Sequence, residues 1–407
     1  MGCHKNSTWY EGDKRFAKKI EELNCAPPSQ QNREEFIKVS KELDDWLRRQ
    51  EIYWAQRSRV SWIKHGDKNT KFFHMKASQR RQRNLIQGIM DPHGRWLEDC
   101  EEVAEVAVKY FNDIFSSGPC SRVEECLEAV PQKVTPDMQL FLSGEYNADE
   151  IKEALFQMGP TKAPGPDGMN ALFYQKFWHI VGDTVVAAAL DFLNSGHMLP
   201  TLNHTHIVLI PKIKNPVKMS DFRSISLCNV IYKIIAKVLA NRLKQVLPQI
   251  IAPTQSAFVP GRLITDNVLV AYEALHTMHG RKKGKIGTLA LKLDVSKAYD
   301  RVEWNFLRQI MLKLGFPGDW VDRVMSCVSS TSFSILINGK PFGMINPTRG
   351  LQQGDPLSPY LFLLCVEGFT SLLQKAELEG NIHGVSICRR APKISHLLFA
   401  DDSLLFC

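Results

Sequence analysis

Two adjacent carboxylates in an apolar run are the first residues of this sequence that could do chemistry. Asp401 and Asp402 stand in FADDSLLFC (399–407), and Asp294 falls near the end of the apolar stretch GTLALKLDV (287–295). A carboxylate among apolar residues is costly unless it is paired or binds a cation. Three carboxylates from neighbouring strands would suit Mg²⁺, which leaves positions for substrate phosphates. Two such ions, about 4 Å apart, catalyse in-line phosphoryl transfer. A bare Asp-Asp pair, however, is also typical of an ordinary surface turn.

Strands and a turn are predicted to position these acids. HLLFADDSLLF (396–406) predicts a strand, a turn that carries both acids, and a second strand. Residues 287–295 alternate between Leu on one face and Ala290, Lys292 and Asp294 on the other, which predicts a buried strand that Asp294 ends. SFSILINGKPF (332–342) predicts a hairpin with a type I′ turn at Asn338-Gly339.

Helical segments are predicted around these strands. Asp300 is expected to cap one helix with Glu303 in a capping box, and Ser358 and Pro359 to be the N-cap and N1 of another. Helices mixed with antiparallel strands predict an α+β sheet with helices packed on one face. The predicted helices are residues 30–65, a short helix opened by Asn147 to Glu150, 170–194, 229–247, and one that follows Thr265-Asp266.

Composition bounds the class of protein. The chain has 407 residues, of which 44% are hydrophobic and 23% charged, enough for two or three domains. No apolar stretch reaches the roughly 18 residues of a membrane span, and the N-terminal MGCHKNS lacks a signal-peptide core. A nuclear or cytoplasmic protein, not a secreted one, with no membrane partner is therefore expected. The ten cysteines form no CxxC pair and no zinc-site spacing.

Charge is distributed in blocks along the chain. Residues 61–84 carry seven Lys/Arg and one acid, residues 98–153 carry 14 acids against four Lys/Arg, and residues 211–244 carry eight Lys/Arg and one acid. The basic blocks suit phosphate backbones, although each is also typical of a solvated helix face. Residues 61–84 are predicted to bind RNA through its phosphates, with Phe72 or Phe73 stacking on bases.

Three strings around the acids occur in an order that is itself informative: LKLDVSKAYD (291–300), RGLQQGDPLSPYLF (349–362) and FADD (399–402). Together they resemble the successive palm motifs of reverse transcriptases of LINE-type (non-LTR) retrotransposons. The resemblance covers about residues 146–407, and SWIKHGDKNTKFFH (61–74) also resembles the segment before the polymerase in plant elements of this type. Four further strings fit the same family: KAPGPDG (162–168), LIPK (209–212), DFRSISL (221–227) and QSAFVPGR (255–262).

The resemblance implies a domain organisation. Residues 146–407 would be the fingers and an incomplete palm of a right-hand polymerase, truncated after the FADD motif and without a thumb. Residues 1–145 would be a helical N-terminal extension, first basic and then acidic, with no endonuclease before it. The short return strand, 403–407, is expected to leave the acidic turn weakly fixed, because a hairpin without flanking strands is only marginally stable.

The resemblance also implies roles for residues that match the motifs. Asp294, Asp401 and Asp402 would be the catalytic, metal-binding carboxylates. Tyr299 would lie beneath the sugar, where a bulky ring rejects a 2′-hydroxyl; the alternative is a core aromatic. Arg262 would face the template; the alternative is a surface cation at a helix N-terminus.

Four further residues are expected to bind the incoming nucleotide. Gln353 and Gly354 would contact the nucleotide and the nascent pair. Arg223 and Lys212 would hold the triphosphate, since Arg can grip two phosphate oxygens at once; Lys214 could replace Lys212.

Two positions depart from the common family pattern. Phe399 stands where many reverse transcriptases have Tyr, and Ser224 where FRPISL would have Pro. The second difference is expected to loosen the loop that presents Arg223.

The predicted function is RNA-directed DNA polymerisation, in which deoxynucleotides are added to a primer 3′-hydroxyl by a two-metal mechanism. Mg²⁺ would be the cofactor, with Mn²⁺ as the alternative ion, and the partners would be an RNA template, a DNA primer and deoxynucleoside triphosphates. The alternatives are a catalytically inactive RNA-binding remnant and an unstable pseudogene product. This chain is expected to polymerise poorly, because it would lack the thumb that holds the primer terminus. Misplacing reactants by about 1 Å can cost on the order of 100-fold in rate.

Overall fold

A computed structural model describes residues 2–58, 70–280, 287–388 and 390–407, which form two compact units. Unit 1 comprises Met1–Glu98, Ile210–Phe222 and Asn338–Lys340; unit 2 comprises Asp99–Leu209, Arg223–Ile337 and Pro341–Cys407. Helices and sheets are mixed, so the predicted α+β class is confirmed. The compact units follow a different division from the domain boundary expected between residues 145 and 146, and that boundary stays a prediction.

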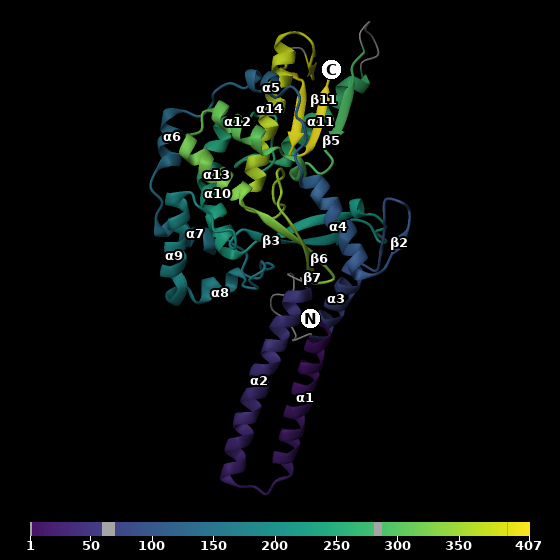
Figure 1. The fold of residues 1–407 in the computed structure, drawn as a ribbon, viewed down its shortest axis with the longest axis vertical. Helices are drawn as coiled ribbons and strands as arrows, with labels where there is room; N and C mark the ends of the chain where they lie inside the picture. Colours follow the sequence, from purple (N-terminus) through teal and green to yellow (C-terminus); the bar gives the residue numbers. More distant parts are fainter. Residues whose placement is uncertain (1, 59–69, 281–286, 389) are drawn as a thin grey trace. The chain divides into compact units, whose positions relative to one another are not determined.

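Unit 1 begins with two long helices that lie side by side, α1 (Gly2–Cys25) and α2 (Gln30–Ser58) (Figure 1). Trp46 on α2 joins them, because its indole N–H donates to Asp13 Oδ1 at 3.0 Å and its ring packs against Phe16 on α1. The helix predicted for residues 30–65 is confirmed as far as Ser58, and the remaining residues of that prediction lie outside the described ranges.

The third helix of unit 1, α3 (Thr70–Asn84), packs its apolar side against α2. Phe73 and Ala77 of α3 form a small core with Trp54 of α2, and Phe73 is only 4% exposed. Of the two rings predicted to stack on bases, Phe73 is excluded, because its ring holds two helices together, and stacking by the partly buried Phe72 stays a prediction. A turn at residues 91–94 joins the antiparallel strands β1 (Ile89–Met90) and β2 (Trp96–Leu97).

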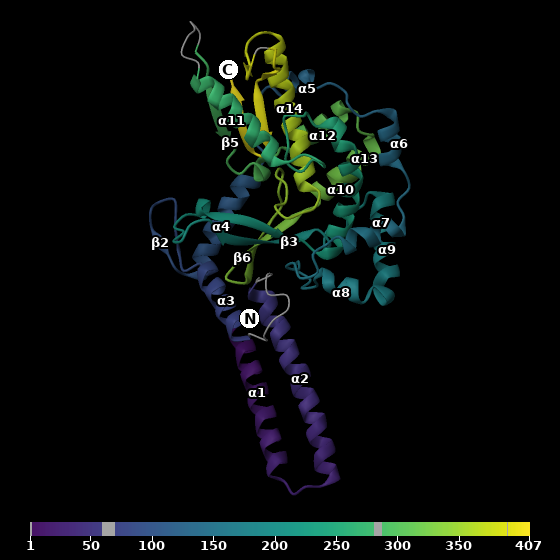
Figure 2. The same cartoon turned by 180° about the vertical axis from the view of Figure 1, so that it is seen from behind.

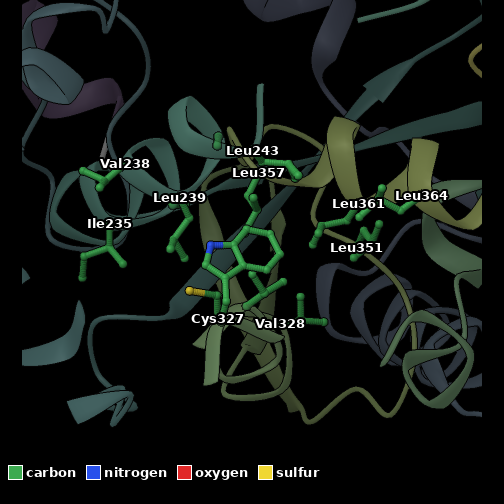
Figure 3. Close-up of a cluster of buried hydrophobic side chains, with 14 of the residues drawn as sticks. Ile235, Val238, Leu239, Leu243, Cys327, Val328, Leu351, Leu357, Leu361 and Leu364 are labelled. Atoms are coloured by element: carbon green, nitrogen blue, oxygen red, sulfur yellow. The ribbon is translucent and has the colours of Figure 1, made fainter. Parts of the chain in front are cut away.

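The main core of unit 2 is built around α10 (Val230–Ile250), which buries residues on nearly all sides. Figure 3 shows side chains from α10, α13 and α14 and from the loop at residues 351–357 converging on this core. The other helices of unit 2 are α4 (Cys100–Phe115), α5 (Val123–Ala129), α6 (Pro136–Ser143), α7 (Ala148–Phe156), α8 (Ala171–Lys176), α9 (Trp178–Ser195), α11 (Ile264–Gly280), α12 (Trp304–Leu314), α13 (Gly318–Ser329) and α14 (Ser358–Leu378).

The helix starts test the predicted caps. The capping box between Asn147 and Glu150 is present at α7. The Asp300 cap is wrong: Asp300 is buried in the 3₁₀ turn Tyr299–Arg301, and α12 begins later, with Glu303 in the N-cap position and no side-chain cap. The helix predicted over 170–194 is broken at Phe177 into α8 and α9.

A four-stranded sheet has the order β4-β3-β6-β7. It consists of β4 (Phe222–Leu227), β3 (His204–Pro211), β6 (Ser332–Ile337) and β7 (Lys340–Ile345), and β3 runs parallel to β6. Asn338 and Gly339 join β6 to β7 with φ angles of 51° and 91°. Positive φ at both central residues is what a type I′ turn requires, so this prediction is confirmed.

A second, three-stranded sheet carries the acids, in the order β10-β11-β5. The strands are β10 (His396–Phe399), β11 (Asp402–Phe406) and β5 (Ala290–Asp294) (Figure 1). The predicted strand, turn and strand are present, but the turn at Ala400 and Asp401 carries only one of the two acids, because Asp402 already begins β11. Figure 2 shows α11 running along this sheet.

The burial predicted for the strand at residues 287–295 is wrong. The face that carries Leu289 and Leu291 is 59% and 45% exposed at these residues. The core against α11 is instead formed on the opposite face, where Ala290 packs with Phe406 and Leu404. The alternation was predicted correctly, but tertiary packing covers the strand at Ala290, on the face opposite the leucines.

The smallest strand pair is β8 (Val385–Ser386) with β9 (Lys393–Ile394). Among the helices described, none combines the length and the apolar character needed to cross a membrane.

Helix α14 offers a matched test of the unit 2 core. Leu361 is fully buried, whereas Leu378 at the end of the same helix is 89% exposed. We expect Leu361→Ala to lower the free energy of unfolding by about 2–5 kcal/mol, because a buried cavity remains. Leu378→Ala should change it by less than about 0.5 kcal/mol. Urea unfolding followed by circular dichroism measures both, and equal effects would show that this core is misassigned.

Candidate active site

Two of the predicted metal-binding acids face each other across the three-stranded sheet. Asp402 on β11 is the direct partner of Asp294 on β5 in the antiparallel register. Directly opposite residues have Cβ atoms about 4.5–5.5 Å apart and lie on the same face. Asp401 precedes Asp402 in the turn and is half-buried, whereas Asp294 and Asp402 are exposed. The sheet therefore brings Asp294 and Asp402 together, with Asp401 next in the chain.

Lys292, for which the sequence predicted no role, lies at this site. Lys292 Nζ is 3.0 Å from Asp402 Oδ1. The hydrogen bond and charge of Asp402, and to a lesser extent the charge of Asp294, raise the pKa of Lys292 above its usual value. Its position was available from the alternation of the strand, since Lys292 and Asp294 share one face. What the sequence could not show is that β11 adds Asp402 to that face.

The donor set at this site can be tested against a divalent ion. Asp294, Asp401 and Asp402 offer only carboxylate oxygens, the ligands that Mg²⁺ prefers. The ammonium of Lys292 offsets one of their three negative charges, so the remaining charge suits a dication. Within the described ranges, no three His, Cys, Asp or Glu side chains are yet gathered closely enough to hold a metal. The three carboxylates suit a divalent ion in chemistry and in charge. In this structure the carboxylate of Asp402 is paired with Lys292.

Tyr299 lies close to the acidic turn. Burial raises the pKa of its phenol to about 12, and the negative charge of Asp401 adds to that shift. Its ring stacks on Phe362 with centroids 4.8 Å apart, and its backbone carbonyl accepts from the N–H of Leu351 at 2.8 Å. The ring is therefore held rigidly beside the site, although its role toward a sugar stays a prediction.

The acidic hairpin is supported on both of its sides. β11 pairs with β5 over five residues. On the other side Gln255 forms a parallel bridge to Leu398 of β10, where the N–H of Leu398 donates to Thr254 O at 2.9 Å. The expectation of a weakly fixed turn is wrong, because it treated the hairpin as lacking flanking chain.

The loop that contains Gln353 and Gly354 is anchored on β4. The carbonyl of Gln353 accepts from the N–H of Ser226 at 2.8 Å. Gly354 has a φ of 121°, and a Cβ there would lie 3.0 Å from Ser226 O, so a larger residue would be strained. Arg223 is exposed on the same strand, and the expected loop around Ser224 is a buried part of β4. Three of the predicted nucleotide contacts thus share one strand and its neighbouring loop.

Lys212, the predicted triphosphate-binding lysine, belongs to unit 1. Its N–H donates to Asp221 O at 2.8 Å and its Nζ to Ser220 O at 3.0 Å. Lys214 is also exposed. The choice between the two lysines therefore stays a prediction.

Arg262 is engaged by backbone carbonyls rather than left free. Its Nη1 donates to Ala252 O and Gln255 O, and its Nη2 to Pro248 O and Ile251 O, at 2.6–3.1 Å. These carbonyls lie at and just after the C-terminal end of α10, where a cation is favourable. This cap is a structural role that the sequence did not indicate, and the template role of Arg262 stays a prediction.

Asp355, in the loop after Gln353 and Gly354, is a buried acid that sequence reasoning also missed. Its Oδ2 accepts from the N–H groups of Leu357 and Ser358 and from Ser358 Oγ, at 2.9–3.1 Å. It thereby caps α14, in which Ser358 is the first helical residue rather than the predicted N-cap. Burial raises the pKa of Asp355 to about 6 even though these hydrogen bonds oppose the shift.

The raised pKa of Asp355 predicts a pH effect on stability. Between about pH 4 and pH 6 the folded chain binds this proton more tightly than the unfolded chain, so stability from this group falls as pH rises through that window. The full effect is roughly 2–3 kcal/mol. Asp355→Asn keeps an acceptor oxygen but cannot titrate, so its stability relative to the unmodified chain should increase from pH 4 to pH 7. Urea midpoints at several pH values test this, and parallel curves would contradict it.

Residues 210–407 match the family described as reverse transcriptase (RNA-dependent DNA polymerase). The chain is 29% identical over 373 residues to the transposon TX1 uncharacterised 149 kDa protein of Xenopus laevis, a match that covers 91% of this chain and 28% of that protein. It is 26% identical over 348 residues to the Retrovirus-related Pol polyprotein from type-2 retrotransposable element R2DM of Drosophila melanogaster, covering 81% of this chain and 30% of that protein.

A shorter and closer match lies in a plant protein. The chain is 52% identical over 68 residues to an uncharacterised mitochondrial protein of Arabidopsis thaliana, covering 17% of this chain and 56% of that protein. The chain thus spans less than a third of the two long relatives and just over half of the short one. The family match covers β4, β5, β10 and β11, the strands from which the site is built, and the two long relatives are transposon proteins, so the chain is similar to the LINE-type (non-LTR retrotransposon) reverse transcriptases.

Proposed function

We propose that this chain is an RNA-directed DNA polymerase that adds deoxynucleotides to a primer 3′-hydroxyl with RNA as template. The observation that carries the proposal is the register that makes Asp294 and Asp402 direct partners, with Asp401 in the adjoining turn. The family match supports the same reading. In right-hand terms, the three-stranded sheet would be the palm, the four-stranded sheet part of the fingers, and residues 1–145 an N-terminal extension.

The three acids are proposed to hold divalent ions, Mg²⁺ or Mn²⁺. Such ions activate the attacking hydroxyl and neutralise charge that develops on the transferred phosphate. The chain contributes the carboxylates of Asp294, Asp401 and Asp402 on a paired sheet, which limits their movement. Lys292 keeps Asp402 oriented on the same face by its ion pair.

Selection and binding of the nucleotide are proposed for residues near this sheet. Arg223, exposed on β4, has a guanidinium suited to two phosphate oxygens at once. Tyr299, fixed by Phe362 and Leu351, would form a rigid wall against a 2′-hydroxyl. Gln353 and Gly354 would contact the nucleotide through a loop anchored on Ser226.

A groove in unit 1 favours RNA binding as a second function that needs no catalysis. Lys76, Arg80 and Arg83 lie along one side of α3 and line this groove of about 580 Å³. Cations interleaved with amides suit a phosphate backbone. Arg81 on the same helix is exposed but does not line the groove. Of the segment 61–84 predicted to bind RNA, one side of α3 is thus the proposed binding surface. Residues 61–69 of that segment lie outside the described ranges. The other lining residues are Ser58, Gln79, Asn84, Ile210 and Pro211.

Catalysis is tested by single-nucleotide addition to a primed RNA template with enzyme in excess. We expect slow, Mg²⁺-dependent addition that falls at least about 100-fold in Asp401→Asn and Asp294→Asn, because each variant removes a proposed metal ligand. RNA affinity should stay within about twofold, because the groove in unit 1 contains neither residue. Gel-resolved extension and fluorescence anisotropy measure the two effects. Equal addition by all three proteins would refute the assignment of the acids.

RNA binding is tested by the salt dependence of affinity. Arg80→Ala/Arg83→Ala should weaken binding to unrelated single strands alike and reduce the slope of log K against log salt by about 1.4, or roughly 0.7 for each lost phosphate contact. Arg81→Ala is the matched control and should change the slope little. Fluorescence anisotropy between low and moderate salt measures the slopes. A control that loses as much as the double variant would show only a general charge effect.

A further inference from the structure

The turn that carries Asp401 begins with an unusual backbone. Ala400 has a φ of 53° and is only 8% exposed. A left-handed conformation is unfavourable for a residue with a Cβ. Its N–H is also buried and needs an acceptor. Something outside the hairpin must therefore hold Ala400 in this conformation.

Gln255 supplies that acceptor. Its Oε1 accepts from the N–H of Ala400 at 3.0 Å and from the N–H of Ala257 at 3.0 Å, and the residue is 1% exposed. The backbone of Gln255 also forms the bridge to Leu398. Gln255 thus bonds both to β10, the strand that leads into the turn, and to Ala400 in the turn itself.

The segment that carries Gln255 is itself fixed. Asn267 on α11 donates through Nδ2 to Leu398 O at 2.8 Å and to Thr254 O at 3.3 Å. Arg262 donates to the carbonyl of Gln255 at 2.7 Å while it caps α10. The amide of Gln255 is therefore presented to Ala400 from a rigid support.

We propose that Gln255 is a positioning residue that fixes the backbone at Ala400 and thereby sets how the turn presents Asp401 beside Asp402 and Asp294. The inference rests on the proposed function, in which these acids hold a divalent ion. Neighbouring carboxylates repel one another before the ion arrives, and a fixed turn keeps them from separating. Metal ligands depend on such supporting hydrogen bonds for their orientation.

Two substitutions separate positioning from filling space. Gln255→Met keeps the length of the side chain but removes the acceptor. Gln255→Glu keeps an acceptor oxygen, and it breaks no other bond, because Gln255 Nε2 has no hydrogen-bond partner among the described residues. Asn203→Leu is a control for general loss of stability: Asn203 is a fully buried amide that bonds to Cys327 and Ser330, outside the acidic sheet.

The experiment measures Mn²⁺ binding to the whole chain by electron paramagnetic resonance. We expect Gln255→Met to weaken Mn²⁺ binding by about 10-fold and Gln255→Glu to retain it within about threefold. Hydrogen exchange at residues 398–402 should rise in Gln255→Met alone. Asn203→Leu should lower the thermal midpoint without changing Mn²⁺ affinity. If Gln255→Met does not fold, Asn267→Leu, which removes the bond to Leu398, takes its place with the same expected direction.

The outcomes distinguish this inference from the proposed function. Unchanged Mn²⁺ affinity in Gln255→Met, with weakened binding in Asp401→Asn, would overturn the positioning role and leave the metal site standing. Unchanged affinity in Asp401→Asn would overturn the metal site and the inference with it. A loss in Asn203→Leu as large as in Gln255→Met would show that Gln255 is merely structural.

Discussion

The register between β11 and β5 is the constraint on which the site depends. It makes Asp402 the partner of Asp294, and a shift of one residue would turn one of these side chains to the opposite face. The register is fixed from several directions. Phe406 and Leu404 pack against α11 on one face, and the bridge at Leu398 closes the other edge of the hairpin. The packing of unit 2 therefore fixes Asp294 and Asp402 opposite each other by opposing this shift.

Charge is the second constraint, and it opposes the first. Bringing Asp294, Asp401 and Asp402 together is unfavourable in the absence of cations, because like charges on neighbouring strands repel. Lys292 relieves part of this repulsion through its ion pair with Asp402. The hydrogen bond from the N–H of Ala400 to Gln255 restrains the backbone of the turn, which the remaining repulsion would otherwise displace. The site thus combines a partial counter-charge with a rigid support, a combination that suits a group meant to receive a mobile cation.

The sequence predicted the elements of the site better than its supports. Alternation and turn residues were enough to predict the hairpin and the strand that ends at Asp294, because both signals are local. The role of Gln255 could not be predicted, because Ala400 lies 145 residues away in the chain. The role of Arg262 was missed for another reason: its partners are backbone carbonyls, which leave no signal in the residue types. Phe73 shows the same limit: an aromatic between cations resembles a stacking residue until a neighbouring helix covers it. Local patterns therefore located the candidate acids, and long-range contacts such as that between Gln255 and Ala400 decided which side chains support them.

The two units would bind a negatively charged ligand in opposite ways under the proposed functions. In unit 1, Lys76, Arg80 and Arg83 line a groove, and their charges would attract phosphates directly. In unit 2, the carboxylates of Asp294 and Asp402 lie on one face, and they repel a triphosphate unless a cation lies between them. Binding of RNA by unit 1 should then need no divalent ion, whereas binding of a nucleotide at the acidic sheet should require one. Such a division would let the chain hold its template before any metal or nucleotide arrives, with the metal deciding only when the acidic site can accept a phosphate.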